Sequence, residues 1–427
     1  MTLMTTPHLR ALAACATVFA GAVVLSTHVG GQTPTATLFE GARLINGNGG
    51  AAVENAAFLV EGSRITAVGR AGQVRAPAGA MRVSLTGKTV MPAIVDTHTH
   101  LSSERDALAA QLTGKTYYGV SAAMSLGQDT GQVGLQVRAT PIPGAALFRT
   151  AGRGITMPEP GRSDVPYWVT TEAEGRKAVQ ELAANKVDIV KIWVDDRDGK
   201  YKKLPPELYS PIIDEAHKQG LRVTAHLFNL SDAKGLLKAG LDAFAHGVRD
   251  VDIDEEFLGM SKQRRALVLV PNLPDRGVVT DLSWLKDSLP AAELAKLQAG
   301  ASTDNPTAQR AFGIQARNLA KMNAAGVKIA LGTDGGVLWA HHLEMADMVA
   351  AGMTPAQVIV AATRNAAEFM RLTDMGTIET GKSADFLVLD ANPLEDITNT
   401  RKITAVYLRG QLVDRAATRA RLTGGTR

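Results

Sequence analysis

The stretch Ile94-Val-Asp-Thr-His-Thr-His100 decides how the rest of the chain is interpreted, because a short apolar run there ends in two histidines. Alternate residues of a β-strand point to the same side, so we expect Asp96, His98 and His100 to face one way. Two imidazoles placed side by side can bind one metal ion. A His-x-His pair is more often an ordinary part of a sheet, so its meaning depends on what ends the later strands.

Short apolar runs alternate with amphipathic stretches between residues 91 and 374. Strands are expected at residues 93–98, 120–125, 145–150, 187–193, 222–226, 243–246, 267–270 and 328–331. Helix-like segments lie between several of them, for example at residues 207–219, 232–238 and 306–325, and another follows the last strand at 343–370, broken near Gly352 and Pro355. Eight strands alternating with helices over roughly 280 residues predict an α/β protein with a (β/α)8 TIM-like barrel. Catalytic residues are then expected at the C-terminal ends of the strands.

The two ends of the chain differ from this middle section. Strand-like runs bounded by turn residues occur before residue 90, where Glu61-Gly-Ser-Arg64 is typical of a hairpin, and again after residue 385. We therefore predict a small β-sandwich domain composed of residues 32–90 and 375–427. Residues 91–374 remain as the metal-dependent catalytic barrel.

The first 31 residues are typical of an export signal peptide. His8 and Arg10 precede an apolar run at residues 11–26, and small residues suit cleavage after Gly31. A run of this length falls short of the roughly 20 residues that cross a bilayer. We expect a periplasmic or secreted protein without stable membrane insertion after cleavage, with a retained membrane anchor as the alternative.

The composition excludes several classes of protein. Of the 427 residues, 45% are hydrophobic and 21% are charged, which is typical of a globular protein with a sizeable core. The 46 Lys+Arg and 42 Asp+Glu nearly balance, and no basic block indicates a nucleic-acid partner. The single cysteine, Cys15, lies in the export segment, which excludes an intramolecular disulfide or a cysteine-based metal cage.

Lys191 is unusual because it lies inside an apolar strand-like run and shares its parity with Ile189 and Trp193. Burial of such a lysine would lower the pKa of its amine and favour the uncharged form. A free amine can react with carbon dioxide to give a carbamate, whose oxygens can bridge two metal ions. Taken alone, a lysine that extends its amine to solvent at a strand end is the simpler interpretation.

Further ligand-type side chains end later strands. His226 and His246 close two short apolar runs that are one βα unit apart, and Asp334 follows the eighth predicted strand. Each of them taken alone would be interpreted as a core histidine or a turn residue. Four imidazoles, one carboxylate and one buried lysine at the same end of a predicted barrel indicate a metal site instead.

This pattern resembles the amidohydrolase superfamily, in its branch with two metal ions and a carboxylated lysine. Six positions match its ligands, namely His98, His100, Lys191, His226, His246 and Asp334. The stretches Ala351-Gly-Met-Thr-Pro355 and Gly381-Lys-Ser-Ala-Asp-Phe386 are also similar to family members, in particular to imidazolonepropionase-related and prolidase-like ones.

The resemblance implies two divalent metal ions. One would be bound by His98, His100 and Asp334 and the other by His226 and His246, with N6-carboxylated Lys191 and a hydroxide between them. Zinc is the expected metal, and manganese, cobalt or iron would suit the same ligands. The resemblance also implies that Asp334 is catalytic: it would accept the proton of the attacking hydroxide and pass it to the leaving group.

The function expected from this site is hydrolysis of an amide bond in a small molecule, such as a dipeptide, an N-acyl amino acid or a related carboxamide. Hydrolysis of a lactone or phosphotriester at the same site is an alternative, and so is a non-catalytic binding protein on this scaffold. We expect a homo-oligomer. Phe228 stands where some related dipeptidases have a tyrosine, so their specificity does not transfer directly. Candidate substrate-binding residues are Arg249, His341, His342, Glu344 and Tyr118.

Overall fold

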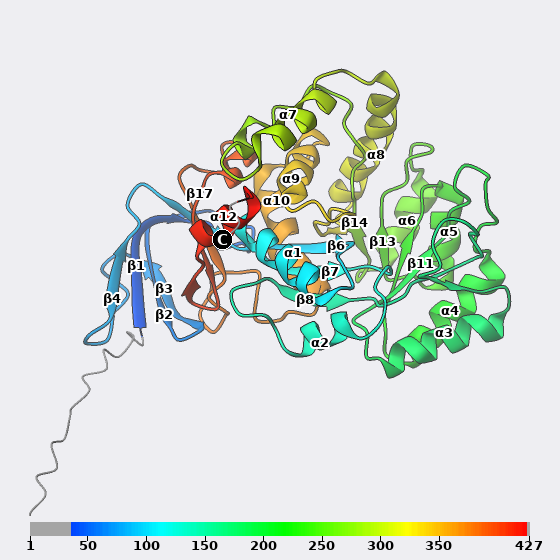
Figure 1. Ribbon diagram of the computed structural model, residues 1–427, viewed down its shortest axis with the longest axis horizontal. Helices are drawn as coiled ribbons and strands as arrows, with labels where there is room; N and C mark the ends of the chain where they lie inside the picture. Colours follow the sequence, from blue (N-terminus) through cyan, green and yellow to red (C-terminus); the bar gives the residue numbers. More distant parts are fainter. Residues whose placement is uncertain (1–35, 425–427) are drawn as a thin grey trace, which may run out of the picture. The chain divides into compact units, whose positions relative to one another are not determined.

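The protein is an α/β structure whose described residues form three β-sheets (Figure 1). The computed structural model describes residues 36–424, so the predicted signal peptide and Cys15 lie outside the described part. Within residues 36–424, no helix has the length and apolar character needed to cross a membrane.

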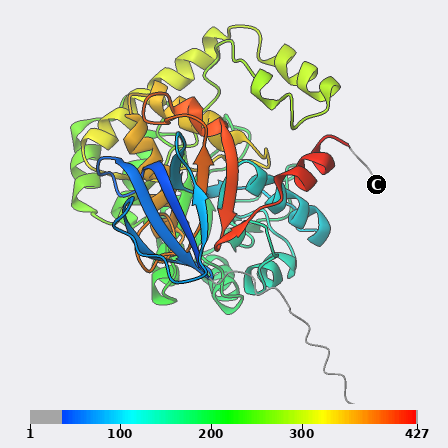
Figure 2. The ribbon, with the colours of Figure 1, turned by 90° about the vertical axis from the view of Figure 1, so that its left-hand side faces the viewer.

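Both ends of the described chain contribute strands to one eight-stranded sheet with the order β18-β17-β16-β5-β1-β2-β3 and β4 also paired to β1. Its strands are β1 (Ala36–Leu44), β2 (Val53–Glu61), β3 (Arg64–Arg70), β4 (Met81–Ser84), β5 (Thr89–Pro92), β16 (Phe386–Leu389), β17 (Ile403–Leu408) and β18 (Gln411–Leu412). Figure 2 shows the blue N-terminal strands beside the orange C-terminal ones, joined where β5 pairs antiparallel with β16.

Strand β1 pairs with different partners along its length. Residues 37–40 pair in parallel with β4, whereas Arg43 and Leu44 pair with β5. The register breaks between Glu40 and Ala42, where Gly41 has a φ of 90° that a side chain would disfavour. Phe39 on this strand packs in a buried aromatic cluster that includes Phe386 of β16, so strands from both ends of the chain share one core.

The other two sheets are parallel. One contains β6 (Ile94–Thr99), β7 (Val120–Ser125) and β8 (Leu147–Thr150), and the other has the order β10-β9-β11-β12-β13-β14-β15. The strands of the second sheet are β9 (Ile155–Thr156), β10 (Tyr167–Trp168), β11 (Val190–Trp193), β12 (Val223–His226), β13 (Ala243–Ala245), β14 (Val268–Val270) and β15 (Lys328–Ile329). Each of the eight predicted runs overlaps a strand, whereas β9 and β10 were not predicted.

Backbone hydrogen bonds connect the two parallel sheets at both ends. The amide of Thr97 in β6 donates to the carbonyl of Leu331 after β15 (3.0 Å), and Thr99 forms a parallel bridge with Gly335. On the other side, the amide of Asp188 before β11 donates to the carbonyl of Thr150 in β8 (2.9 Å). These contacts bring the C-terminal ends of β6 and β15 together.

Helices alternate with the parallel strands, and α3, α4, α5 and α6 follow one another beside the seven-stranded sheet (Figure 1). Thr171 and Glu174 form a capping box that begins α3, and the helix predicted at 207–219 is α4. The helices are α1 (Arg105–Tyr117), α2 (Val133–Ala139), α3 (Glu172–Ala184), α4 (Pro206–Lys218), α5 (Leu230–Ala239), α6 (Glu255–Gln263), α7 (Ala291–Gly300), α8 (Pro306–Ala324), α9 (Ala340–Ala350), α10 (Pro355–Val360), α11 (Ala366–Phe369) and α12 (Arg415–Leu422).

Candidate metal centre

The six predicted metal ligands lie at the ends of five parallel strands. His98 lies in β6 and His100 directly follows it, Lys191 lies in β11, His226 ends β12, His246 follows β13, and Asp334 follows β15. The rings of His226 and His246 are 4.5 Å apart between centroids, and those of His98 and His246 are 5.4 Å apart. The structure therefore brings the predicted ligands from distant parts of the sequence together.

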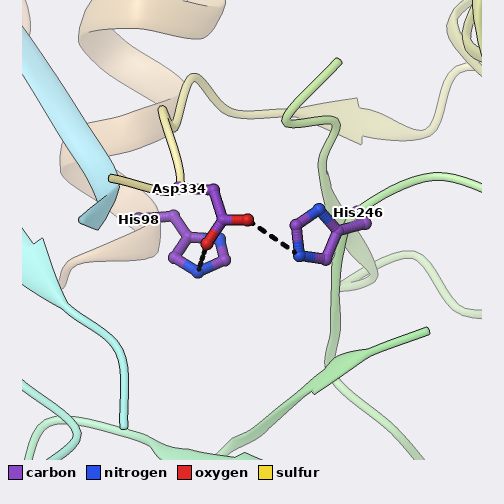
Figure 3. Close-up of side chains that lie close together, drawn as sticks. All are labelled: His98, His246 and Asp334. Carbon is purple, nitrogen blue, oxygen red and sulfur yellow. Dashed lines mark ion pairs between the residues drawn. The ribbon is translucent and has the colours of Figure 1, made fainter. Parts of the chain in front are cut away.

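Asp334 is the residue on which the histidines converge. Its Oδ1 lies 3.0 Å from Nε2 of His98 and 2.9 Å from Nε2 of His100, and its Oδ2 lies 3.4 Å from Nε2 of His246. Figure 3 shows its carboxylate between His98 and His246. Burial opposes ionisation, but His98 and His100 outweigh it and hold the pKa of Asp334 well below its usual range. The carboxylate is therefore ionised.

His98 is fully buried and its Nδ1 lies 2.8 Å from Oδ1 of Asn272. Burial, followed by the nearby charge of Lys191, lowers the pKa of His98 to about 4, so the imidazole is neutral. With the proton on Nδ1 for Asn272, Nε2 presents a lone pair to the ionised carboxylate of Asp334. An imidazole nitrogen and a carboxylate oxygen 3.0 Å apart are donor atoms that a single divalent metal ion can bind together.

His246 adds a third electron-pair donor. It is 3% exposed, and neither ring nitrogen has a hydrogen-bond partner within residues 36–424. Burial, together with the neighbouring His226, lowers its pKa well below the usual value. One ligand atom from each of His98, His246 and Asp334 lies within 4.8 Å of the others. Neutral imidazoles and a carboxylate in this arrangement fit a divalent metal ion.

Lys191 lies where its amine can reach this cluster. The residue is fully buried, and Nζ lies 3.3 Å from Nε2 of His98. Burial lowers the pKa of Lys191 to about 7, so a large fraction of the amine is uncharged at neutral pH. That is the form in which an amine reacts with carbon dioxide. Carboxylation of Lys191 stays a prediction.

His226 is held by a loop whose role was not predicted from the sequence. Its Nε2 lies 2.8 Å from Oδ2 of Asp195 and 3.0 Å from Nη1 of Arg197. Burial lowers the pKa of His226 to about 3, so the ring is neutral and donates its Nε2 proton to Asp195. Nδ1 is then the nitrogen available to a metal ion. The acidic and basic run Asp195-Asp-Arg-Asp198, directly after the strand of Lys191, was the available signal.

A cavity of about 380 Å³ opens onto the centre. It is lined by His100, Gln128, Arg162, Ser163, Trp193, Arg197, His226 and Asp334. Arg249, a predicted substrate-binding residue, lies next to the centre: its guanidinium stacks 3.1 Å from the centroid of the Phe228 ring, and that ring lies 4.5 Å from the ring of His226.

The structure places three other predicted substrate-binding residues elsewhere. His341 and His342 are buried in α9, and their Nε2 atoms lie 2.9 and 3.1 Å from the backbone oxygen of Tyr118. The hydroxyl of Tyr118 donates to Ser288 (2.8 Å). None of the three side chains lines the 380 Å³ cavity. We therefore correct their predicted role: they pack α9 against the end of α1, because the Nε2 atoms of both histidines and the Tyr118 hydroxyl find partners in the interior.

Glu344 and Asp96 also differ from expectation. Glu344 accepts from the backbone amide of Leu273 (3.1 Å), lines a separate cavity of about 280 Å³, and burial raises its pKa well above the usual value. The carboxylate of Asp96 does not join the histidines; it binds the buried amine of Lys115 (2.8 Å). The register of β6 is irregular between Asp96 and Thr99, so simple alternation does not hold there.

Comparisons with known proteins agree with the resemblance described above. Imidazolonepropionase from Deinococcus radiodurans is 27% identical over 395 residues, which cover 84% of this chain and 92% of that protein. Ochratoxinase from Aspergillus niger is 28% identical over 304 residues, 63% of this chain, and the match spans 58% of the ochratoxinase. The crystal structure of a candidate prolidase from Bifidobacterium longum has a TM-score of 0.73 and 26% identity, over 91% of this chain and 98% of that one. Residues 169–413, more than half of the chain, match the Amidohydrolase family, and the chain belongs to this family.

Proposed function

We propose that the protein is a metal-dependent hydrolase that cleaves an amide bond in a dipeptide, an N-acyl amino acid or a related small carboxamide. The proposal rests on one observation: one ligand atom from each of His98, His246 and Asp334 lies within 4.8 Å of the others, with the carboxylate of Asp334 between the two imidazoles. The names of the relatives, an ochratoxinase, an imidazolonepropionase and a candidate prolidase, support a carbon–nitrogen bond as the target.

The proposal includes the architecture that holds the site. The two parallel sheets are taken as one (β/α)8 barrel, supported by the hydrogen bonds that link them at both ends. The eight-stranded sheet from both chain ends is taken as the composite β-sandwich domain. In a barrel the C-terminal strand ends form the active face, which is where the ligands lie.

The ligand assignment follows from the donor atoms described above. His98, His100 and Asp334 would hold one divalent ion; His226 and His246 would hold the other, with carboxylated Lys191 between them. Zinc is our expectation. When bound, such ions supply Lewis acidity that activates water and polarises a carbonyl.

Asp334 is positioned to move a proton. Its Oδ1 faces both His98 and His100, whereas Oδ2 has the single, longer contact to His246. Oδ2 is therefore the oxygen that accepts the proton of the attacking water and returns it to the leaving nitrogen.

The test is a substrate screen with metal-loaded protein. Dipeptides, N-acyl amino acids, carboxamides, lactones and phosphotriesters are offered to enzyme reconstituted with zinc, manganese or cobalt. We expect turnover of carbon–nitrogen substrates, close to two metal ions per chain by elemental analysis, and a loss of about 1,000-fold in Asp334→Asn. Asp252→Asn, a change at an exposed ion pair with Arg317, should retain full activity.

A protein that binds no divalent metal ion would contradict the proposal. So would metal-loaded protein that turns over only lactones or phosphotriesters. We also propose export, based on residues 1–31, and homo-oligomerisation; cellular fractionation and light scattering test these separately.

A further inference from the structure

One wall of the 380 Å³ cavity consists of two arginines that share one buried glutamate. The side chain of Glu159 is 2% exposed; its Oε1 accepts from Nε of Arg197 (3.1 Å) and its Oε2 accepts from Nη1 of Arg162 (2.6 Å). Arg162 lies between β9 and β10, and Arg197 follows β11. Both arginines line the cavity together with His226 and Asp334.

The side chain of Arg197 is fixed by two carboxylates, and one of its N–H donor atoms has no acceptor among residues 36–424. Its φ of 56° is a left-handed conformation that non-glycine residues seldom adopt, and its backbone amide donates to Oδ1 of Asp195 (3.0 Å). Its Nη1 lies 2.6 Å from Oδ2 of Asp195. Its Nη2 is buried and finds no acceptor within residues 36–424. A buried donor without an acceptor costs free energy, and an acceptor supplied by a ligand would recover it.

Arg162 presents a cationic edge to the cavity. The carboxylate oxygens of Glu159 and Asp195 are already paired with the two guanidinium groups. The carboxylate of Asp334 contacts the histidines. Arg162 remains 38% exposed on its side chain, so its outer edge is accessible from the cavity. Planar guanidinium groups match the geometry of a carboxylate, with two parallel N–H···O bonds.

We propose that Arg162 and Arg197 bind a carboxylate of the substrate. The preferred substrates are then amides with a free carboxylate near the scissile bond, such as N-acyl amino acids and dipeptides, rather than neutral carboxamides. This inference rests on the proposed function and narrows it. The cavity volume of about 380 Å³ suits a ligand of this size, with the acyl group at the metal centre and the carboxylate at the arginines.

The test compares substrates that differ only in the carboxylate. N-acetyl-L-phenylalanine is paired with N-acetyl-2-phenylethylamine, and N-benzoylglycine with N-methylbenzamide, so that the scissile bond is the same within each pair. We expect kcat/KM to be about 100-fold higher for the carboxylates. Arg162→Gln should lower kcat/KM for the carboxylates about 10- to 100-fold, mainly through KM, with under about twofold change for the neutral analogues. Arg197→Gln should lower kcat/KM for both classes because Arg197 also contacts His226, and the loss should be about 10-fold larger for the carboxylates.

Two controls keep the result interpretable. Arg82→Gln, an exposed arginine on β4, removes the same charge and should change neither substrate class. Arg162 is partly exposed, so Arg162→Gln tests the inference even if Arg197→Gln fails to fold.

Calorimetric titration of the metal-loaded protein with N-benzoylglycine separates the two proposals. Binding that is lost in both arginine variants, with no turnover of any carbon–nitrogen substrate, would support the carboxylate site and overturn the proposed function. Equal turnover of charged and neutral partners, in wild type and variants alike, would overturn the carboxylate site and leave the proposed function intact. Absence of arginine-dependent binding together with absence of turnover would overturn both.

Discussion

Replacing Lys115 with methionine should destabilise the protein and weaken its metal binding together. Nζ of Lys115 lies 2.8 Å from Oδ2 of Asp96, and both side chains are completely buried. The same Oδ2 accepts from the hydroxyl of Thr333 (2.9 Å), and Oδ1 faces the backbone amide of His98 (3.4 Å). Asp96 thus contacts the backbone at one predicted ligand and the residue before another, Asp334.

The magnitude follows from the burial of the pair. Methionine keeps most of the aliphatic volume of Lys115 but leaves the Asp96 carboxylate buried without its cation. Removal of one partner of a buried ion pair costs about 3–5 kcal/mol, which is roughly a 100- to 4,000-fold change in the unfolding equilibrium. Metal affinity should fall about 10-fold or more, as is usual when groups that orient metal ligands are removed.

Urea unfolding of the metal-free protein and calorimetric titration with zinc measure the two effects. Lys177→Met, at an exposed position of α3, should change stability by less than about 0.5 kcal/mol. Lys115→Met combined with Asp96→Asn should recover much of the loss, because no unpaired charge remains. A loss below about 1 kcal/mol in Lys115→Met, or a double variant as unstable as the single one, would refute the reasoning.

Three further predictions concern the metal centre. Asp195→Asn should weaken metal binding about 10- to 100-fold, because the acceptor that orients His226 loses its charge; unchanged affinity in calorimetry would contradict this. Lys191→Ala should lose most activity and regain part of it with added formate or acetate, whereas full turnover without them would exclude a carbamate. Removal of metal with a chelator should lower Tm, since ligand at 100 times Kd stabilises by about 2.7 kcal/mol; an unchanged Tm after chelation and after reloading would contradict a site formed in the native state.

The four predicted histidine ligands could be found from the sequence because they end short apolar runs, whereas Lys191 was noticed because it lies inside such a run. The proximity of His226 and His246 was predicted from the rule that the C-terminal ends of parallel strands lie at one face of the sheet. Asp195 and Arg197 could not be found in this way, since they lie in a loop whose residues follow no period. Their contacts with His226 exist only after β11 and β12 have paired.

The histidines of α9 show the converse limit. His341 and His342 share the residue type of the metal ligands and follow the same strand as Asp334. The direction in which their side chains point depends on which side of α9 packs against Tyr118. The local sequence does not show which side that is. The pairing of both chain ends was predicted because strand-like runs bounded by turn residues occur at each end. Which strands pair, β5 with β16, became known only from the structure.

That pairing has a consequence for biosynthesis. Pro92 in β5 lies opposite Phe386 in β16. The sheet formed by the N-terminal strands is therefore incomplete until β16, near the C-terminal end of the chain, pairs with β5. During translation, the edge of β5 and the apolar face around Phe39 stay uncovered until most of the polypeptide has been synthesised. Contacts this far apart in sequence fold slowly, and open strand edges promote aggregation. We therefore expect a chain that stops before Phe386 to leave this edge and apolar face uncovered and to aggregate.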